Sequence, residues 1–191
     1  MAIDFSQVKT ITIPEGSVTK ITDSNGNILW QQSQPSEGWH TIWEGNKTCS
    51  ITKSGTNDPV ISGESKNFAQ TAAGTGYTPK IRITFSYSNT NTDYDNWENN
   101  FNINSSTQTT ISSPVIIEAL KDFSILNTNV ILVMCDGTAS NSAILGVGLK
   151  SNRNKTNNSR NISLLGHKSG NMSYNGNFTL TFTVTKIEQY Y

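Results

Sequence analysis

The sequence has few charged residues, no net charge and no long apolar run. Its 191 residues include 14 Lys plus Arg and 14 Asp plus Glu, so the formal net charge is zero. Proteins that bind nucleic acid or anionic membranes through electrostatics are usually basic, so we expect neither partner. No segment reaches the ~18 apolar residues of a membrane span, and the opening "MAIDFSQVKT" has no apolar stretch typical of a signal peptide.

Residues that commonly carry catalysis or bind metals are also scarce. Cys49 and Cys135 are the only cysteines; we expect two buried free thiols, and a disulfide between them remains an alternative. His40 and His167 are the only histidines, and the sequence contains no nucleophile elbow, zinc-protease helix, phosphate-binding loop or C-x-x-C pair. We therefore expect no catalytic residue, no metal and no cofactor, and hence no enzyme.

Asn, Ser, Thr and Gly dominate the chain, and all four weaken helices. Apolar and polar residues alternate in several segments, most clearly in "IRITFSYS" and "NFTLTFTVTKIEQYY". This alternation predicts that Phe85, Val133, Phe178 and Phe182 face inward. Many short strands joined by polar turns indicate an all-β fold, with an antiparallel β-sandwich of jelly-roll type as its main part.

One segment departs from the strand pattern. In "SSPVIIEALKDF", Ser113 can cap a helix, and Pro114 can occupy its first position. We therefore expect a short helix near residues 114–123, with a strand as the alternative. A single helical crossover would leave the fold class unchanged.

The N-terminal part of the chain has the pattern of a self-contained hairpin. The segments "VTKIT" and "NILWQ" flank "DSNG", and a two-residue type I′ turn would place Ile21 opposite Trp30 and Thr22 opposite Leu29. Two strands alone are marginally stable in water, so this hairpin needs the rest of the chain, a second copy or another protein. The polar "QSQPSEG" after it is typical of a linker. We expect a hairpin module at 1–31, a linker at 32–38 and the sandwich at 39–191.

Two polar loops are candidates for surface contact. The segment "SNTNTDYDNWENN" combines carboxylates with aromatic rings but lacks the EF-hand calcium pattern. A solvated loop with one ring turned inward is the main interpretation, and a glycan or protein contact or a calcium site are the alternatives. The segment "KSNRNKTNNSRNISLLGHK" is basic without acidic residues. A flexible polar loop is the main interpretation, and a contact with a phosphate-bearing polymer or an acidic neighbour is the alternative. The candidate contact residues are Asp93, Tyr94, Asp95, Trp97, Glu98, Arg153, Lys155 and Arg160.

The hairpin segment also carries a resemblance. "VKTITIPEGSVTKITDSNGNILWQ" resembles the opening of small virion structural proteins of phages and prophages of gut Gram-positive bacteria. Those proteins share an Ile-x-Ile-Pro-Glu-Gly strand and turn, followed by a hairpin that ends in Gly-x-x-Leu-Trp. The matching residues cover about an eighth of the chain, and the candidate attachment residues among them are Ile11, Ile13, Val18, Ile21, Leu29 and Trp30.

The resemblance implies a structural component of a phage particle. The hairpin would dock on another virion protein and display the sandwich at the surface, as a capsid decoration, a head fibre or a tail-associated protein. The particle would assemble in the cytoplasm of the bacterial host, and we expect a homo-oligomer. The alternative is a receptor- or glycan-binding module of a tail fibre that contacts a glycan of the host surface.

Overall fold

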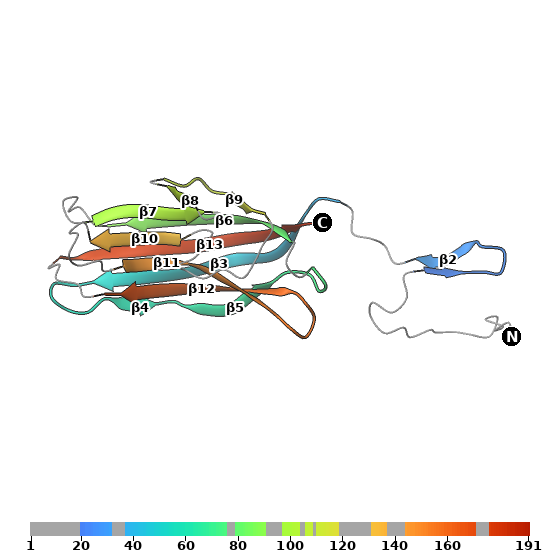
Figure 1. The fold of residues 1–191 in the computed structure, drawn as a ribbon, viewed down its shortest axis with the longest axis horizontal. Coiled ribbons are helices and arrows are strands. Elements are labelled where there is room, and N and C mark those ends of the chain that lie inside the picture. The colour runs from blue at the N-terminus through green and yellow to red at the C-terminus, as the bar shows by residue number, and fades with distance from the viewer. Residues whose placement is uncertain are drawn as a thin grey trace. The chain divides into compact units, whose positions relative to one another are not determined.

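A computed structural model describes most of the chain, in two compact units, Met1–Ser36 and Glu37–Tyr191 (Figure 1). Each unit is considered by itself. The described residues are 20–31, 37–75, 79–90, 97–103, 106–108, 110–118, 131–136, 144–170 and 176–191.

The described part of the first unit is a hairpin of β1 (Lys20–Thr22) and β2 (Ile28–Gln31). Ile21 pairs with Trp30 as predicted, but the register then shifts, so that Thr22 pairs with Ile28 rather than Leu29. The predicted type I′ turn is also wrong. That turn needs positive φ at both central residues, whereas in this fully described turn only Gly26 has one, at 85°.

Asp23 explains the turn that forms instead. Its carboxylate accepts hydrogen bonds from the backbone N–H groups of Asn25 (2.9 Å) and Asn27 (2.8 Å) and from the Asn27 side-chain amide (2.8 Å). Its backbone carbonyl accepts the N–H of Gly26 at 3.1 Å. The Asn27 side chain is the main reason why the pKa of Asp23 is lowered. Local side-chain chemistry therefore fixes this turn, as is common for Asp at turn starts.

The second unit, called the body below, is an antiparallel β-sandwich. Its first sheet has five strands in the order β4-β3-β13-β6-β9. They are β4 (Val60–Ser62), β3 (Trp39–Lys53), β13 (Phe178–Tyr190), β6 (Lys80–Asn89) and β9 (Val115–Ile117). The second sheet has six strands in the order β5-β12-β11-β10-β7-β8. They are β5 (Ser65–Gln70), β12 (Arg160–Ser169), β11 (Ile144–Arg153), β10 (Ile131–Asp136), β7 (Trp97–Ile103) and β8 (Ser106–Gln108).

The strand orders follow the predicted jelly-roll topology with one addition. The first sheet has the order β3-β13-β6-β9, with β4 added at the edge beside β3. Without the β10–β11 hairpin, the second sheet has the order β5-β12-β7-β8. The chain passes from sheet to sheet as in a double Greek key. The β10–β11 hairpin widens the second sheet between β12 and β7, and β10 lies centrally, between two strands. The prediction of an all-β sandwich is confirmed.

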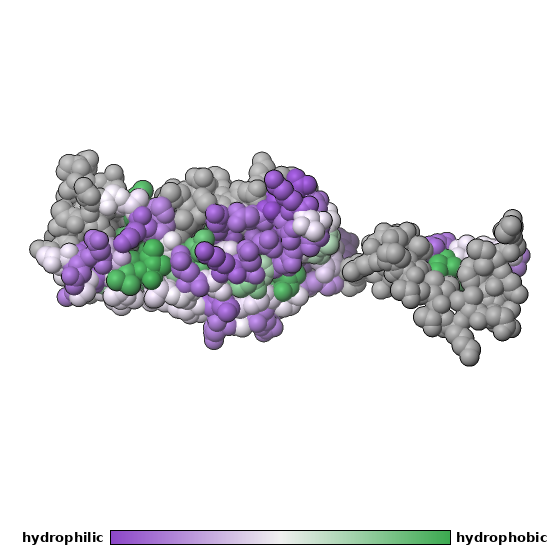
Figure 2. All heavy atoms as spheres, turned by 90° about the horizontal axis from the view of Figure 1, so that it is seen from below, coloured by the Kyte–Doolittle hydropathy of each residue, from purple (hydrophilic) through white to green (hydrophobic). Residues whose placement is uncertain are grey.

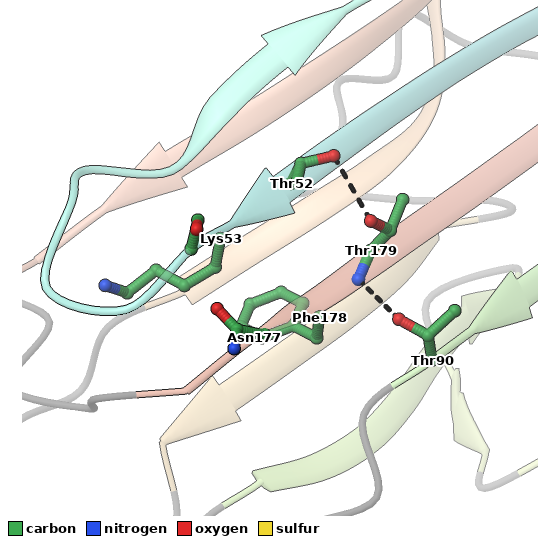
Figure 3. A pocket seen from close by; sticks show the side chains of 7 residues that line it. Thr52, Lys53, Thr90, Asn177, Phe178 and Thr179 are labelled. Atoms are coloured by element: carbon green, nitrogen blue, oxygen red, sulfur yellow. Dashed lines mark hydrogen bonds between the residues drawn. The ribbon is translucent and has the colours of Figure 1, made fainter.

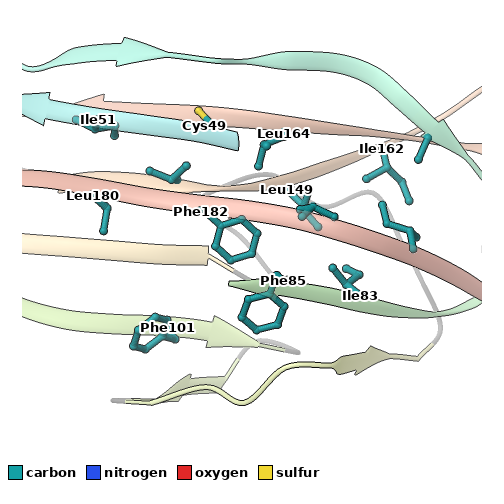
Figure 4. Packing of buried hydrophobic residues seen from close by; sticks show 14 of the residues in the cluster. Cys49, Ile51, Ile83, Phe85, Phe101, Leu149, Ile162, Leu164, Leu180 and Phe182 are labelled. Carbon is teal, nitrogen blue, oxygen red and sulfur yellow. The ribbon is translucent and has the colours of Figure 1, made fainter. Parts of the chain in front are cut away.

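The core lies between the two sheets (Figure 4). The alternating residues of β6 and β13 supply much of it, as predicted: Phe85 is 5% exposed, Phe178 2% and Phe182 0%. The rings of Phe85 and Phe182 stack with centroids 5.1 Å apart. The side chain of Val133, also predicted to face inward, lies outside the described residues.

Two register shifts in the pairing of β13 with β3 change which residues face solvent. The first falls between Val184 and Lys186. At the second, Ile187 pairs with Trp43 and Glu188 pairs with Thr41, so Ile42 of β3 is an extra residue between them. The shifts move the inward positions of β13 from Val184 to Ile187, which is fully buried. Glu188 then takes a position on the outer face, as the pleat requires.

The predicted helix near 114–123 is wrong where the structure describes it. Val115–Ile117 is strand β9, in which Ile117 pairs with Ile81 at the edge of the first sheet. Burial of Ile117 (1% exposed) against the core outweighs the helix-start pattern at Ser113 and Pro114. Ser113 serves the sheet instead, because its hydroxyl oxygen accepts the N–H of Phe85 at 2.9 Å. Residues 119–123 lie outside the described residues.

Candidate functional site

The hairpin exposes apolar side chains (Figure 2). Leu29, a candidate attachment residue, is 60% exposed, its neighbour Ile28 is 55% exposed, and Ile21 is partly buried. Two strands offer too little area to cover such residues. Ile11, Ile13 and Val18 lie outside the described residues, as does the side chain of Trp30, so the structure brings together only part of the predicted attachment set.

The body has two ends that matter for the predicted contact loops. At one end, called the linker end, the chain enters at Glu37 and β13 finishes: Gly38 N–H donates to Tyr191 O at 2.6 Å, and Tyr191 N–H donates to Gly38 O at 3.1 Å. At the other end, called the far end, β13 begins, and Thr90 N–H donates to Thr179 O at 3.0 Å. The length of β13 separates the two ends by roughly 35–40 Å.

The segment "SNTNTDYDNWENN", called the acidic-aromatic loop below, begins at the far end, with the last residues of β6. Asp93, Tyr94 and Asp95 lie outside the described residues. The backbones of Trp97 and Glu98 belong to β7, where they pair with Asp136 and Cys135, and nothing is described of their side chains. The prediction that this loop contacts a glycan or a protein therefore stays a prediction.

The basic segment proves to be a tight turn rather than a long loop. Asn154 N–H donates to Ser159 O and Asn158 N–H donates to Asn154 O, both at 2.9 Å, and Asn158 has a positive φ of 57°. Side-chain oxygens of Asn154 and Asn157 accept N–H groups within the same turn. Arg153 and Lys155 are exposed here, as a surface contact requires.

The prediction that Arg160 contacts a partner at the surface is wrong. Arg160 is 0% exposed and is the largest fully buried side chain described. It opens β12, where alternation places it on the same face as the buried Ile162 and Leu164. Thr71 fixes its backbone by a pair of hydrogen bonds, to its carbonyl at 3.0 Å and from its N–H at 2.8 Å.

The basic residues also fail to form one patch. Lys168 lies eight residues further along the extended β12, roughly 25 Å from Arg160, and its Nζ donates to Pro59 O at 3.3 Å. Arg160 pairs with Thr71, and the next N–H, of Ala72, donates to Gln189 Oε1 at 2.8 Å near the end of β13. The turn at 154–159 therefore lies at the linker end, opposite the acidic-aromatic loop.

Sequence reasoning missed an aromatic and ionic cluster at the linker end. Trp39 and Tyr190 pack edge to face with ring centroids 5.4 Å apart. The guanidinium of Arg82 lies 4.5 Å from the centroid of the Trp39 ring, and Lys80 lies within 5.9 Å of both rings. Tyr190 Oη donates to Glu37 at 2.9 Å. The first and last strands of the body pair here, so "WHT" near its start and "QYY" at its end were the available signal.

The cluster is anchored by a bidentate ion pair. Arg82 Nε and Nη2 donate to the two carboxylate oxygens of Glu188 at 2.7 and 2.9 Å, and Lys186 lies 3.0 Å from the same carboxylate. The Glu188 side chain is 8% exposed. Hydrogen bonds from Arg82, chiefly, lower the pKa of Glu188 to about 2. These groups satisfy one another, so the cluster stabilises the linker end and presents few unsatisfied charges to a ligand.

A surface pocket of about 280 Å³ lies at the far end, between the last residues of β3 and the first of β13 (Figure 3). Its lining includes four hydroxyl side chains, an amide and one buried ring: Thr52, Ser54, Thr90, Thr179, Asn177 and Phe178. Of the predicted contact residues, Arg153, Lys155 and Arg160 have described side chains, and none of these three lines the pocket, although Thr90 belongs to the acidic-aromatic loop. Hydroxyl-rich strand ends were visible in the sequence, but their convergence depends on long-range pairing.

The described residues hold no group of three His, Cys, Asp or Glu side chains suited to a metal ion. Cys49 is a buried free thiol, and burial raises its pKa to about 12. His40 stacks on Tyr191 at 4.3 Å between centroids. Among the residues that the structure describes, no helix is long and apolar enough to cross a membrane.

Comparison with known proteins gives no relative. No protein-family model, no curated protein and no solved structure matches the chain.

Proposed function

We propose that the protein is a structural component of a bacteriophage particle. Its N-terminal hairpin docks on another virion protein, and its β-sandwich body is displayed at the particle surface. The observation that carries this proposal is the hairpin: it belongs to a separate compact unit, and it leaves Ile28 and Leu29 more than half exposed. The resemblance of residues 8–31 to virion proteins supports the same assignment.

Physical chemistry explains why such a hairpin suits docking. A two-stranded sheet has two free edges, each of which can pair with a strand of a partner. Exposed Ile28 and Leu29 would add apolar burial to that pairing, at roughly 25 cal/mol for each square ångström removed from water. The turn is set by contacts within the hairpin itself, through Asp23 and Gly26.

The body is the rigid unit that the particle displays, and this role requires no catalysis. Its core is built by both sheets, and its linker end is held by the Gly38–Tyr191 backbone pair and the Arg82–Glu188 ion pair. We propose that it assembles as a homo-oligomer in the bacterial cytoplasm, where the particle is built. Glycan contact at the host surface remains the second role, and the pocket at the far end bears on it.

The test compares particles assembled with altered hairpins. Deletion of residues 1–31 is expected to leave the body folded, by circular dichroism and heat unfolding, but absent from purified particles. Leu29→Ser in the full chain is expected to lower occupancy severalfold, because an exposed Leu can be replaced without unfolding the hairpin. Ser24→Ala, at an exposed polar site of the same turn, is the matched control and should assemble normally.

Full occupancy of the truncated protein on particles would refute docking through the hairpin. Equal occupancy of the Leu29→Ser and Ser24→Ala proteins would show that the exposed apolar side chains take no part in docking.

A further inference from the structure

The pocket at the far end is built from groups that both donate and accept hydrogen bonds. Thr52 Oγ1 and Thr179 Oγ1 lie 3.3 Å apart, and the Thr90 hydroxyl oxygen accepts the N–H of Thr179 at 2.7 Å. Asn177 Oδ1 accepts the N–H of Gly55 at 2.9 Å. These contacts fix the positions of the side chains but leave each hydroxyl with capacity for a further bond, and leave the Asn177 amide NH₂ to donate.

Among the described lining residues, the one charged side chain is turned away from these groups. Lys53 is 2% exposed, and its ammonium donates to the carbonyls of Gly55 at 2.6 Å and Asn57 at 2.7 Å. Figure 3 shows Lys53 extending away from Thr52 and Thr179. The ammonium therefore holds the loop after β3, and the other polar side chains among the described lining residues are uncharged.

Phe178 limits the strength of any binding. Its side chain lines the pocket and is only 2% exposed, so it gives an apolar contact rather than an open ring face for stacking. A small polar ligand held by a few neutral hydrogen bonds in a shallow site binds weakly. Useful affinity would then require many copies acting together, as on a multivalent particle.

We propose that this pocket binds a single uncharged sugar residue of a surface glycan. Neighbouring hydroxyls of a sugar match closely spaced hydroxyl and amide groups, and the volume of about 280 Å³ suits one small ring rather than a long chain segment. The inference builds on the proposed display of the body on a particle, because only many copies would make such binding effective. The pocket also lies at the opposite end of the body from Glu37, where the chain enters.

The experiment measures sugar binding by the full-length protein in solution, without particles. The probes are glucose, galactose and N-acetylglucosamine, with glucuronic acid as the charged comparator, followed by NMR shifts of the backbone amides. We expect millimolar affinity for at least one uncharged sugar, with shifts at Thr52, Ser54 and Thr179. Since no particle is present, failure of hairpin docking would not alter this result.

Matched valine variants locate the site. Thr52→Val removes a hydroxyl of the pocket at constant shape, and should weaken binding by about 3–10-fold, the cost of one neutral hydrogen bond. Thr48→Val makes the same change on the same strand outside the pocket, at a hydroxyl 2.9 Å from that of Thr183, and should bind normally. Ser54→Ala, at an exposed position, provides a second pocket variant if Thr52→Val unfolds.

Three outcomes would overturn the proposal. The first is that none of the three uncharged sugars shifts the pocket amides at concentrations well above the millimolar range. The second is equal binding by the wild-type, Thr52→Val, Ser54→Ala and Thr48→Val proteins. The third is a clear preference for glucuronic acid, which would mean that the Lys53 charge rather than the neutral groups governs the site.

Discussion

The hairpin and the body are built from the same kind of element but are stabilised differently. In the hairpin, the carboxylate of a single Asp accepts three hydrogen bonds within the turn, while Ile28 and Leu29 remain exposed. In the body, apolar residues far apart in sequence, such as Ile51 and Leu164, meet in one core and are fully buried. Local chemistry is enough to set a register, but stability comes from burial between layers.

The largest expected effect tests the core of the body. Phe182→Ala should lower the free energy of unfolding of the body by roughly 3–5 kcal/mol, because Phe182 is fully buried and stacks on Phe85. Urea unfolding of the full-length protein measures this loss, while NMR signals of the Asp23 turn should not change. Loss of the turn signals together with the core would mean that the hairpin and the body unfold as one unit.

Lowering the pH should reduce the free energy of unfolding of the body, because Glu188 becomes protonated. Its pKa of about 2 in the folded state lies below the ordinary value of 4.5. The ion pair therefore contributes fully above about pH 4.5, and its contribution is lost as the pH falls toward 2. At ~1.4 kcal/mol for each pKa unit, the loss is at most about 3.5 kcal/mol.

Urea unfolding between pH 6 and pH 2 measures this contribution. Between pH 6 and pH 2, the free energy of unfolding of the Glu188→Gln protein should fall less than that of the wild-type protein. Glu118→Gln is the control, because Glu118 pairs with Lys80 but its side chain is 69% exposed. An equal fall in the Glu188→Gln and wild-type proteins would contradict the role assigned to this ion pair.

The same substitution in the two regions gives the smallest and most direct contrast. Gly63 and Gly26 both have positive φ, at 76° and 85°. A Cβ at Gly63 would collide with the backbone carbonyl of Thr48, whereas one at Gly26 meets open space. Gly63→Ala should destabilise the body by about 2 kcal/mol, and Gly26→Ala should cost the hairpin about 1 kcal/mol through φ alone.

Urea unfolding of the body and amide exchange in the hairpin turn measure these two costs separately. If Gly26→Ala lowered the stability of the body as well, the comparison between independent units would fail.

Sequence periodicity predicted the parts of the fold that depend on local alternation. Ile81, Ile83 and Phe85 follow the period of two and are buried as expected. The period fails beyond Val184, where a register shift moves Ile187 and Gln189 into the interior and Glu188 to the outer face. Such a shift results from pairing with β3 and β6, which no local pattern records.

The candidate sites also divide into local features, which the sequence predicts, and features that depend on long-range pairing, which it does not. The exposure of Leu29 follows from the shortness of the hairpin, which the sequence makes plain. Arg160 was expected at the surface because its neighbours are polar, but it opens a strand whose alternate residues face the core. The far-end pocket joins Thr52, Thr90 and Thr179 from three separate strands or their ends, so only the pairing of β3, β13 and β6 brings them together.

The backbone pair between Gly38 and Tyr191 has a practical consequence for engineering. Any peptide fused after Tyr191 would emerge beside the point where the linker enters, and would leave the far-end loops unobstructed. A short bridge could also join these two positions, and new termini could be opened in the turn at 154–159, giving a circularly permuted body with the same sheets. The body is thus suited to be fused to, or inserted into, other proteins as a complete domain.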